Sequence, residues 1–298
     1  MGNFLNFLIK ESFLLAERNL HSKECIEQIS KNECIKKSNH YFICSVEKTE
    51  FRLKRIKISN SHNIKLRFII GGKKTKSYTF DLRRLIPGIK FIYLKNNSDN
   101  LKISVTNEMN QLFFLEPELF EKEYNINLNN PPNLLYIGKS INVIKRLTKG
   151  HHHLNKALSK KDDKTDIRIY FISLKYSYSG LPNPDNQIHY FLGNIDTSLL
   201  GISMDSDLME LIERVFIHFF KPKYNELHKN TDIKEDKRLQ ELIIEKGLNG
   251  LIFSYGMKGY AYQFQSDLQP FQAEVITLDT RIQNLTYLPG VHLDLISI

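Results

Sequence analysis

The sequence predicts an α+β fold, and three observations support this prediction. Short apolar runs, several of which alternate with basic residues, occupy residues 40–115, as in half-buried strands. Residues 207–220 carry apolar side chains at helical spacing and are followed by a proline, which predicts an amphipathic helix. Between these segments, residues 120–228 alternate between strand and helix patterns. We therefore expect a mixed central domain with a further α+β segment on each side.

Length and composition bound the class of protein. A chain of 298 residues can form one large domain or two to three small ones. Its hydrophobic content of 41% and charged content of 25% are typical of a soluble globular protein. Three cysteines without Cys-x-x-Cys spacing argue against a disulfide framework or a zinc knuckle. The chain has neither an apolar run of about 18 residues nor a secretion signal, so we expect a cytoplasmic protein without membrane contact.

The chain divides into three predicted domains: a basic N-terminal domain (residues 1–118), a central domain (119–228) and a C-terminal region (229–298). Residues 3–30 have apolar side chains at roughly helical spacing and are predicted to form one or two helices. The C-terminal region begins with a charged helix and continues with strand patterns. Its nearly neutral charge suits self-association or a protein partner.

The formal net charge of +9 is concentrated in the N-terminal domain. Within residues 51–90 Asp81 is the only acid among many Lys and Arg residues. Phosphate neutralisation dominates non-specific nucleic-acid affinity, so this segment is a candidate docking surface; a solvated basic sheet face is the alternative. The candidate substrate contacts are Arg52, Lys54, Arg55, Lys73, Lys74 and Lys76.

The central domain is predicted in more detail. Residues 123–128 and 134–137 are expected to form a hairpin around an Asn-Pro-rich turn. A helix over residues 143–158 and a strand over residues 167–174 follow. The amphipathic helix over residues 207–220 completes the domain.

Two motifs in this domain indicate its chemistry. Tyr136 opens a Tyr-Ile-Gly-Lys-Ser-x-Asn run, and Arg146 lies eight residues beyond its glycine. About 70 residues later, Glu213 precedes Pro222 by nine residues, and Asn225 follows. The pair of motifs resembles the GIY-YIG nucleases over about residues 120–228. The resemblance implies a three-stranded antiparallel sheet flanked by helices and hydrolysis of phosphodiester bonds, mostly in DNA.

The resemblance also implies roles for individual residues. Glu213 would hold a single Mg²⁺ or Mn²⁺ ion, with Glu210 one turn earlier as the competing carboxylate. Arg146 would bind the scissile phosphate, a geometry that lysine reproduces poorly. Lys139 would contact phosphate, and Asn225 would support Glu213 or the waters of the metal ion, unless it is a simple turn residue.

The first family motif is the weakest part of the match. No Gly-Ile-Tyr occurs, and the nearest candidate is Tyr124, twelve positions before Tyr136 and followed by Asn-Ile. Tyr124 would activate water, or it would pack across the predicted hairpin. Tyr136 is a second candidate for a catalytic hydroxyl. His151 would act as a general base or a phosphate ligand, with an exposed helix position as the alternative.

The sequence therefore predicts a metal-dependent endonuclease that cleaves double-stranded DNA. Restriction or phage defence is the expected biological role. A binding protein with an inactive nuclease fold is one alternative, supported by the missing tripeptide. An RNA-cleaving nuclease is another.

Overall fold

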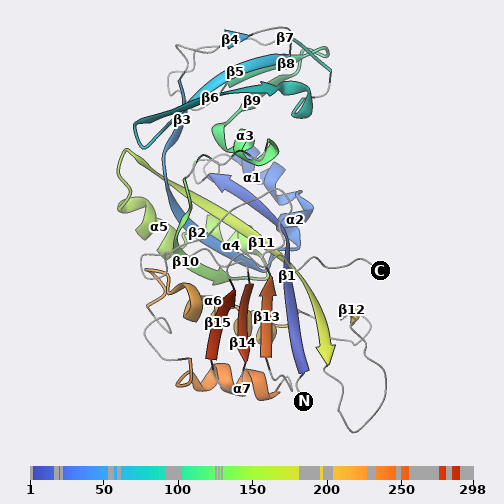
Figure 1. Ribbon diagram of the computed structural model, residues 1–298, viewed down its shortest axis with the longest axis vertical. Helices are drawn as coiled ribbons and strands as arrows, with labels where there is room; N and C mark the ends of the chain where they lie inside the picture. The colour runs from blue at the N-terminus through green and yellow to red at the C-terminus, as the bar shows by residue number, and fades with distance from the viewer. Residues whose placement is uncertain are drawn as a thin grey trace.

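The computed structural model has the mixed α+β architecture that the sequence predicts (Figure 1). Its described residues are 3–16, 20, 23–52, 57–58, 62–86, 88–91, 103–124, 126, 128, 130–180, 195–196, 204–226, 233–245, 250–254, 275–279 and 284–288.

The strands run in chain order as follows: β1 (Asn3–Ala16), β2 (His40–Glu47), β3 (Thr49–Phe51), β4 (Lys57–Ile58), β5 (Asn63–Ile70), β6 (Lys73–Asp81), β7 (Ile89–Phe91), β8 (Ile103–Asn107), β9 (Leu112–Leu115), β10 (Asn133–Lys139), β11 (Thr165–Gly180), β12 (Ile195–Asp196), β13 (Gly250–Ser254), β14 (Val275–Asp279) and β15 (Asn284–Leu288). The helices are α1 (Lys23–Ser30), α2 (Glu33–Lys36), α3 (Pro117–Glu123), α4 (Val143–Thr148), α5 (His152–Ser159), α6 (Ser206–Phe220) and α7 (Lys237–Glu245), with a 3₁₀ turn at Leu82–Arg84.

One large sheet takes strands from all three predicted domains. Among the described residues its order is β10-β2-β11-β1-β13-β14-β15, with β12 beside β11. All neighbours are antiparallel except β1 and β13. The sheet therefore joins the N-terminal segment, the segment with the Tyr-Ile-Gly motif and the C-terminal segment in one layer.

Helices cover both faces of the β10-β2-β11 part of this sheet, because successive side chains of a strand point to opposite faces. On one face, Phe42 and Cys44 of β2 pack against apolar residues of α6 and α7. On the other, Tyr41 and Ile43 pack with residues of α1, α2, α4 and α5. Helix α7 thus shares a core with α6, although the sequence assigned it to a separate C-terminal region.

The N-terminal segment corrects the helix predicted from residue 3. Residues Asn3–Ala16 form strand β1, and the described helix begins only at Lys23. β1 pairs along its length with β11 and over five residues with β13, so it lies inside the sheet. Interior strands have nearly continuous apolar runs, and over short segments such runs also match helical spacing.

The helix predicted over residues 143–158 is divided into α4 and α5. Gly150 adopts a φ of +90°, a conformation that residues other than glycine rarely take, and it lies between the two helices. His151 then caps α5, its ring Nδ1 accepting the backbone N–H of Leu154 at 3.2 Å. The break lets α5 start in a new direction with His151 at its first turn.

Residues between β2 and β10 form an inserted unit with its own core. Strands β3–β6 make one sheet and β7–β9 another, and α3 packs with them around Phe51, Phe68, Phe80 and Phe120. Figure 1 shows these elements together at one end of the molecule, above the large sheet. On β5, buried Ile64, Leu66 and Phe68 alternate with residues such as exposed Lys65, as the sequence predicts.

The inserted unit is attached to the large sheet by buried and backbone interactions. Asn130 accepts the N–H of Glu47 at 3.0 Å and donates to its carbonyl at 2.7 Å, which brings the two ends of the insertion together. Arg168 of β11, 1% exposed, pairs with Glu121 of α3 at 3.0 Å. An ion pair this deeply buried is costly to break, so it holds α3 in place against the sheet. No described helix is long and apolar enough to cross a membrane.

A buried histidine links the large sheet to α6 and should make stability depend on pH. His40 is fully buried, and its Nε2 lies 3.0 Å from the carbonyl oxygen of Met209. Burial lowers the pKa of His40 to about 4, with nearby Lys139 acting in the same direction. Between about pH 6.5 and pH 4, His40 therefore binds a proton in the unfolded chain but not in the folded chain.

We expect the free energy of unfolding to fall by roughly 2 kcal/mol through His40 as pH drops from about 6.5 to 5. His40→Gln keeps a donor for Met209 but does not titrate, so it should flatten this dependence in denaturant titrations across that range. The control is His152→Gln, at an exposed histidine, which should retain the parental slope. An unchanged slope in His40→Gln would contradict the assignment.

Candidate active site

The strand opposite the Tyr-Ile-Gly motif is β2, not the segment before residue 130. The hairpin predicted from residues 123–128 and 134–137 is wrong, because β10 pairs with β2 in antiparallel register. In that register Tyr41 lies directly across from Gly138. The tyrosine beside the motif therefore comes from the strand before the inserted unit.

Gly138 leaves the space in which two tyrosine rings meet. A Cβ built on it would lie 2.5 Å from the hydroxyl of Tyr41 and 2.7 Å from the ring of Tyr136. Its φ is not positive, and it lies within β10, so it does not form a turn. A bulge between Leu134 and Tyr136 shifts the pairing register and places Tyr136 on the same face as Tyr41.

Tyr41, Tyr136 and Arg146 lie close together on this face. The two tyrosine rings are 6.1 Å apart, and both tyrosines raise the pKa of Arg146, with Tyr41 the larger influence. Tyr41 is fully buried, whereas Tyr136 is 8% exposed and Arg146 is exposed. Burial raises the pKa of Tyr41 well above its usual range, so its hydroxyl keeps its proton at neutral pH.

His151 orients the Tyr41 hydroxyl. Its Nε2 lies 2.6 Å from the Tyr41 oxygen, while its Nδ1 accepts the backbone N–H of Leu154. With Nδ1 as the acceptor, the proton of the neutral ring lies on Nε2, which donates to Tyr41. Burial and Arg146 lower the pKa of His151 to about 4, so the ring stays neutral. Neither nitrogen has a free lone pair, which argues against the expected general base.

The contact with His151 gives the Tyr41 hydroxyl a direction. The Tyr41 oxygen accepts the Nε2–H of His151, which leaves the hydroxyl hydrogen for a second partner. The ring of His153 stacks on Tyr136 at 4.2 Å and keeps it flat against α5. Tyr136, which is 8% exposed, is the more accessible of the two tyrosines.

Glu213 faces the tyrosines from α6. It is 18% exposed and shifts the pKa values of both Tyr41 and Tyr136 upward by its negative charge. Burial raises the pKa of Glu213 itself to about 7, an effect that Lys139 opposes and Glu210 reinforces. A cation bound here would relieve the cost of burying this carboxylate.

Glu210 has a different electrostatic environment. Arg214 bonds it at 2.8 Å, and Lys139 and Arg238 lie at 3.7 and 3.9 Å. Although burial acts in the other direction, these cations lower the pKa of Glu210. Glu213 has Lys139 at 3.9 Å as its ion-pair partner in the described structure. Glu213 is thus the less neutralised carboxylate and the better candidate ligand. Lys139 is their shared counter-ion rather than a side chain projecting alone into solvent.

A second network fixes the position of α6. Asp236, which precedes α7, accepts from Arg214 at 2.8 Å, from the N–H of Leu239 at 3.1 Å, and lies 2.8 Å from His218 Nε2. Burial opposes ionisation of Asp236, but these donors hold its pKa below the usual range. Through Arg214, the network also orients Glu210 on the turn before Glu213.

Asn225 holds the motif strand rather than Glu213. Its side chain accepts the N–H of Ile137 at 2.8 Å and donates to the carbonyl of Ile137 at 2.9 Å. The neighbouring Tyr224 N–H bonds Leu135 at 2.8 Å. Both ends of the amide are occupied by backbone, so Asn225 positions β10 from outside the cluster.

Tyr124 lies in the inserted unit, away from this cluster. Its ring stacks on Phe120 and packs on Phe80, and its hydroxyl donates to the carbonyl of Asp81. Burial and Asp81 raise the pKa of Tyr124 to about 12. It is a packing aromatic of the inserted core, although it does not pack across the predicted hairpin, which does not form.

The candidate substrate contacts belong to the same unit. Arg52 is half-buried, and its backbone N–H donates to the backbone carbonyl of Arg67 at 2.8 Å. Lys73 is exposed at the start of β6. Lys74 and Lys76 lie on β6 with side chains outside what the structure describes, and Lys54 and Arg55 lie outside the described residues.

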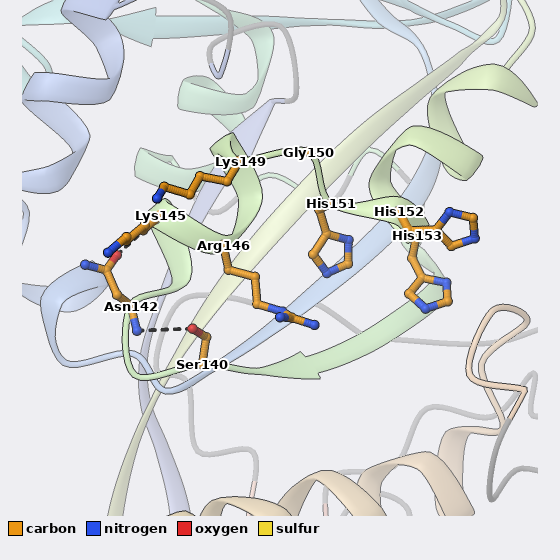
Figure 2. A pocket seen from close by; sticks show the side chains of 9 residues that line it. All are labelled: Ser140, Asn142, Lys145, Arg146, Lys149, Gly150, His151, His152 and His153. Atoms are coloured by element: carbon orange, nitrogen blue, oxygen red, sulfur yellow. Dashed lines mark hydrogen bonds between the residues drawn. The ribbon is translucent and has the colours of Figure 1, made fainter.

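A cavity of about 550 Å³ opens beside the cluster (Figure 2). Its lining consists of Ser140, Asn142, Lys145, Arg146, Lys149, Gly150, His151, His152 and His153. Arg146 and His151 thus belong both to the cavity and to the tyrosine cluster. The lining contains no acidic residue.

The described residues contain no group of three or more His, Cys, Asp or Glu side chains arranged to hold a metal ion. Mg²⁺ keeps several waters and uses few protein ligands, so one buried carboxylate such as Glu213 fits its requirements. A site that needs several protein ligands, as zinc does, does not fit the same residues.

Sequence reasoning missed Tyr41 and His153. Tyr41 is followed by Phe-Ile, the same Tyr-x-Ile pattern that drew attention to Tyr124. The long insertion concealed it, because the family spacing to Tyr136 excluded a partner so far upstream. Nothing in the local sequence indicates that His153 stacks on a tyrosine.

Comparison of the chain with protein-family models, curated proteins and solved structures finds no match.

Proposed function

We propose that this chain is a metal-dependent endonuclease of the GIY-YIG type that hydrolyses phosphodiester bonds in DNA. The observation that supports it most is the meeting of Tyr41, Tyr136, Arg146 and Glu213 from four separate elements around Gly138. A fold that only binds nucleic acid has no need of two buried tyrosine hydroxyl groups beside Glu213, a carboxylate whose ion-pair partner, Lys139, is 3.9 Å away. Cleavage of foreign DNA, in restriction or phage defence, is the biological setting that we propose.

Arg146 is the residue that would bind the scissile phosphate. Its side chain is exposed, and it lies near enough to Tyr41 and Tyr136 for both to raise its pKa. A guanidinium can bond two oxygens of one phosphate. A guanidinium placed at this point would stabilise negative charge that develops during the reaction.

Tyr136 and Glu213 supply the remaining chemistry. Hydrolysis joins a water oxygen to phosphorus and breaks one P–O ester bond, so one proton leaves the water and one reaches the departing oxygen. The Tyr136 hydroxyl, supported by Tyr41, can transfer a proton at this place. A Mg²⁺ or Mn²⁺ ion held by Glu213 would polarise the phosphate and lower the pKa of its bound water.

The missing Gly-Ile-Tyr tripeptide favoured an inactive fold as long as Tyr124 was the best replacement. Tyr41 removes most of that argument, because it lies across from Gly138, bonds His151 and has its ring 6.1 Å from that of Tyr136. The decisive experiment is incubation with duplex DNA, single-stranded DNA and RNA, with and without Mg²⁺. Metal-dependent cleavage of duplex DNA is expected.

Single hydroxyl deletions distinguish the three tyrosines. Tyr136→Phe should lower kcat by about a hundredfold, because it removes the hydroxyl that is proposed to transfer a proton. Tyr41→Phe should have a loss of similar order, since it removes the hydroxyl that bonds His151 beside Tyr136 and Arg146. Tyr124→Phe is the matched control in the inserted core and should leave kcat unchanged. Loss of cleavage in Tyr124→Phe alone, at an unchanged Tm, would contradict this arrangement.

Paired substitutions on α6 test the metal ligand. Glu213→Gln keeps the side-chain shape but removes its charge, so Mg²⁺-dependent cleavage should fall on the order of a hundredfold or more while DNA affinity survives. Glu210→Gln, one turn earlier, should reduce stability through Arg214 but retain a similar Mg²⁺ dependence. A titration of cleavage rate against Mg²⁺ compares them. Reversed effects would move the ligand to Glu210.

The basic insertion is tested by charge removal. Replacing Lys73, Lys74 and Lys76 with Ala should weaken binding of all DNA sequences alike and reduce the slope of log affinity against log salt. The control replaces Lys31, Lys36 and Lys37, which are exposed at and near α2. Fluorescence anisotropy across a salt series measures both slopes. A slope equal to that of the parent protein would place the docking surface elsewhere.

A further inference from the structure

The cavity beside α4 is lined by two lysines in addition to Arg146. Its volume of about 550 Å³ is in the range of pockets that hold small ligands. Two of its lysines, Lys145 and Lys149, have no part in the tyrosine cluster. Figure 2 shows their side chains extending from one side of α4, while Arg146 extends from the other side toward His151.

The two lysines differ from other lysines near the site. Lys139 has Glu210 and Glu213 as neighbours, and Lys156 bonds Glu226 at 2.8 Å. In the described part of the chain, no ion pair involves Lys145 or Lys149. Together with Arg146 they give the cavity three positive charges and no acid, which suits an anion.

The local backbone keeps both lysines together. Asn142 caps α4 by accepting the N–H of Lys145 at 2.9 Å, and Ser140 accepts the N–H of Asn142 at 3.1 Å. One turn later, the N–H of Lys149 bonds the carbonyl of Lys145 at 3.2 Å. Residues four apart on a helical turn lie on the same side, so the two ammonium groups can converge on one anion.

We propose that this cavity binds a second phosphate group, the one next to the scissile phosphate on the same strand, through Lys145 and Lys149. The inference rests on the proposed nuclease function, in which Arg146 binds the scissile phosphate. Arg146 links the two positions, since it belongs to the cavity and to the tyrosine cluster. Glu213 and its metal ion would act on the scissile phosphate, and the lysine pair would fix the strand beside it.

The test uses thymidine 3′,5′-bisphosphate, which carries two phosphates on one nucleoside, without metal. The wild-type protein should bind it about tenfold more tightly than thymidine 5′-monophosphate or thymidine 3′-monophosphate, as measured by calorimetry, because charge-assisted hydrogen bonds at a second site add affinity. In Lys145→Gln/Lys149→Gln this advantage should disappear. Lys161→Gln/Lys164→Gln removes the same charge at exposed residues outside the cavity and should retain it.

The same variants are compared in Mg²⁺-dependent cleavage of duplex DNA. Lys145→Gln/Lys149→Gln should raise KM about tenfold and leave kcat within about twofold, since the lysines bind substrate equally in the ground and transition states. Equal binding of bisphosphate and monophosphates by the wild type, or an advantage that survives in this variant, would overturn the second phosphate site even if the enzyme cuts DNA. Absence of all nucleic-acid cleavage with the bisphosphate advantage intact would remove the nuclease assignment and leave the two-phosphate site standing.

Discussion

The candidate site depends on one close contact, the passage of the Tyr41 ring over Gly138. No side chain larger than hydrogen fits at Gly138, because a Cβ would lie 2.5 Å from the Tyr41 hydroxyl. The pairing of β2 with β10 sets this contact, and the bulge before Tyr136 brings the second ring to the same face. Asn225 then holds β10 from its other side by bonding both backbone groups of Ile137. Small shifts in this pairing would separate the two tyrosine rings.

Unequal charge compensation distinguishes residues that are close together. Glu210 and Glu213 lie one helical turn apart. Arg214 forms an ion pair with Glu210, whereas burial has the largest effect on the pKa of Glu213 and raises it. Lys139 serves both carboxylates, whereas Lys145 and Lys149 on the far side of Arg146 face no acid within the cavity lining. The site thus has a carboxylate side suited to a cation and a lysine side suited to an anion. Such a division agrees with a substrate whose phosphate lies between them.

The inserted unit between β2 and β10 is compatible with the pairing of these strands because its ends are held together. Loop-closure entropy grows only slowly with loop length, so a long insertion adds little cost once it has a core of its own. Phe68, Phe80 and Phe120 supply that core, and Asn130 joins the strand ends at Glu47. The buried pair of Arg168 and Glu121 then fixes the orientation of α3 against the large sheet.

Local patterns were sufficient for much of the fold and for part of the candidate site. Helix α6 follows from its apolar spacing and the proline after it, and the alternation on β5 follows from its basic and apolar residues. Tyr136 and Arg146 were predicted as site residues because they share one short motif, and Glu213 because it precedes Pro222 by nine residues. The strand β1 was mistaken for a helix, since a short apolar run is compatible with both structures until its neighbours are known.

The sequence by itself determined the α+β class, the residues of the Tyr-Ile-Gly motif and the amphipathic helix with its carboxylates, because each depends on neighbours within a few turns. Only the tertiary structure decided that Tyr41, and not Tyr124, lies beside Tyr136, that Asn225 bonds backbone and that His151 donates to a tyrosine. These outcomes depend on strand pairing across an insertion of more than 80 residues. No local property of the chain specifies which distant strand completes such a sheet.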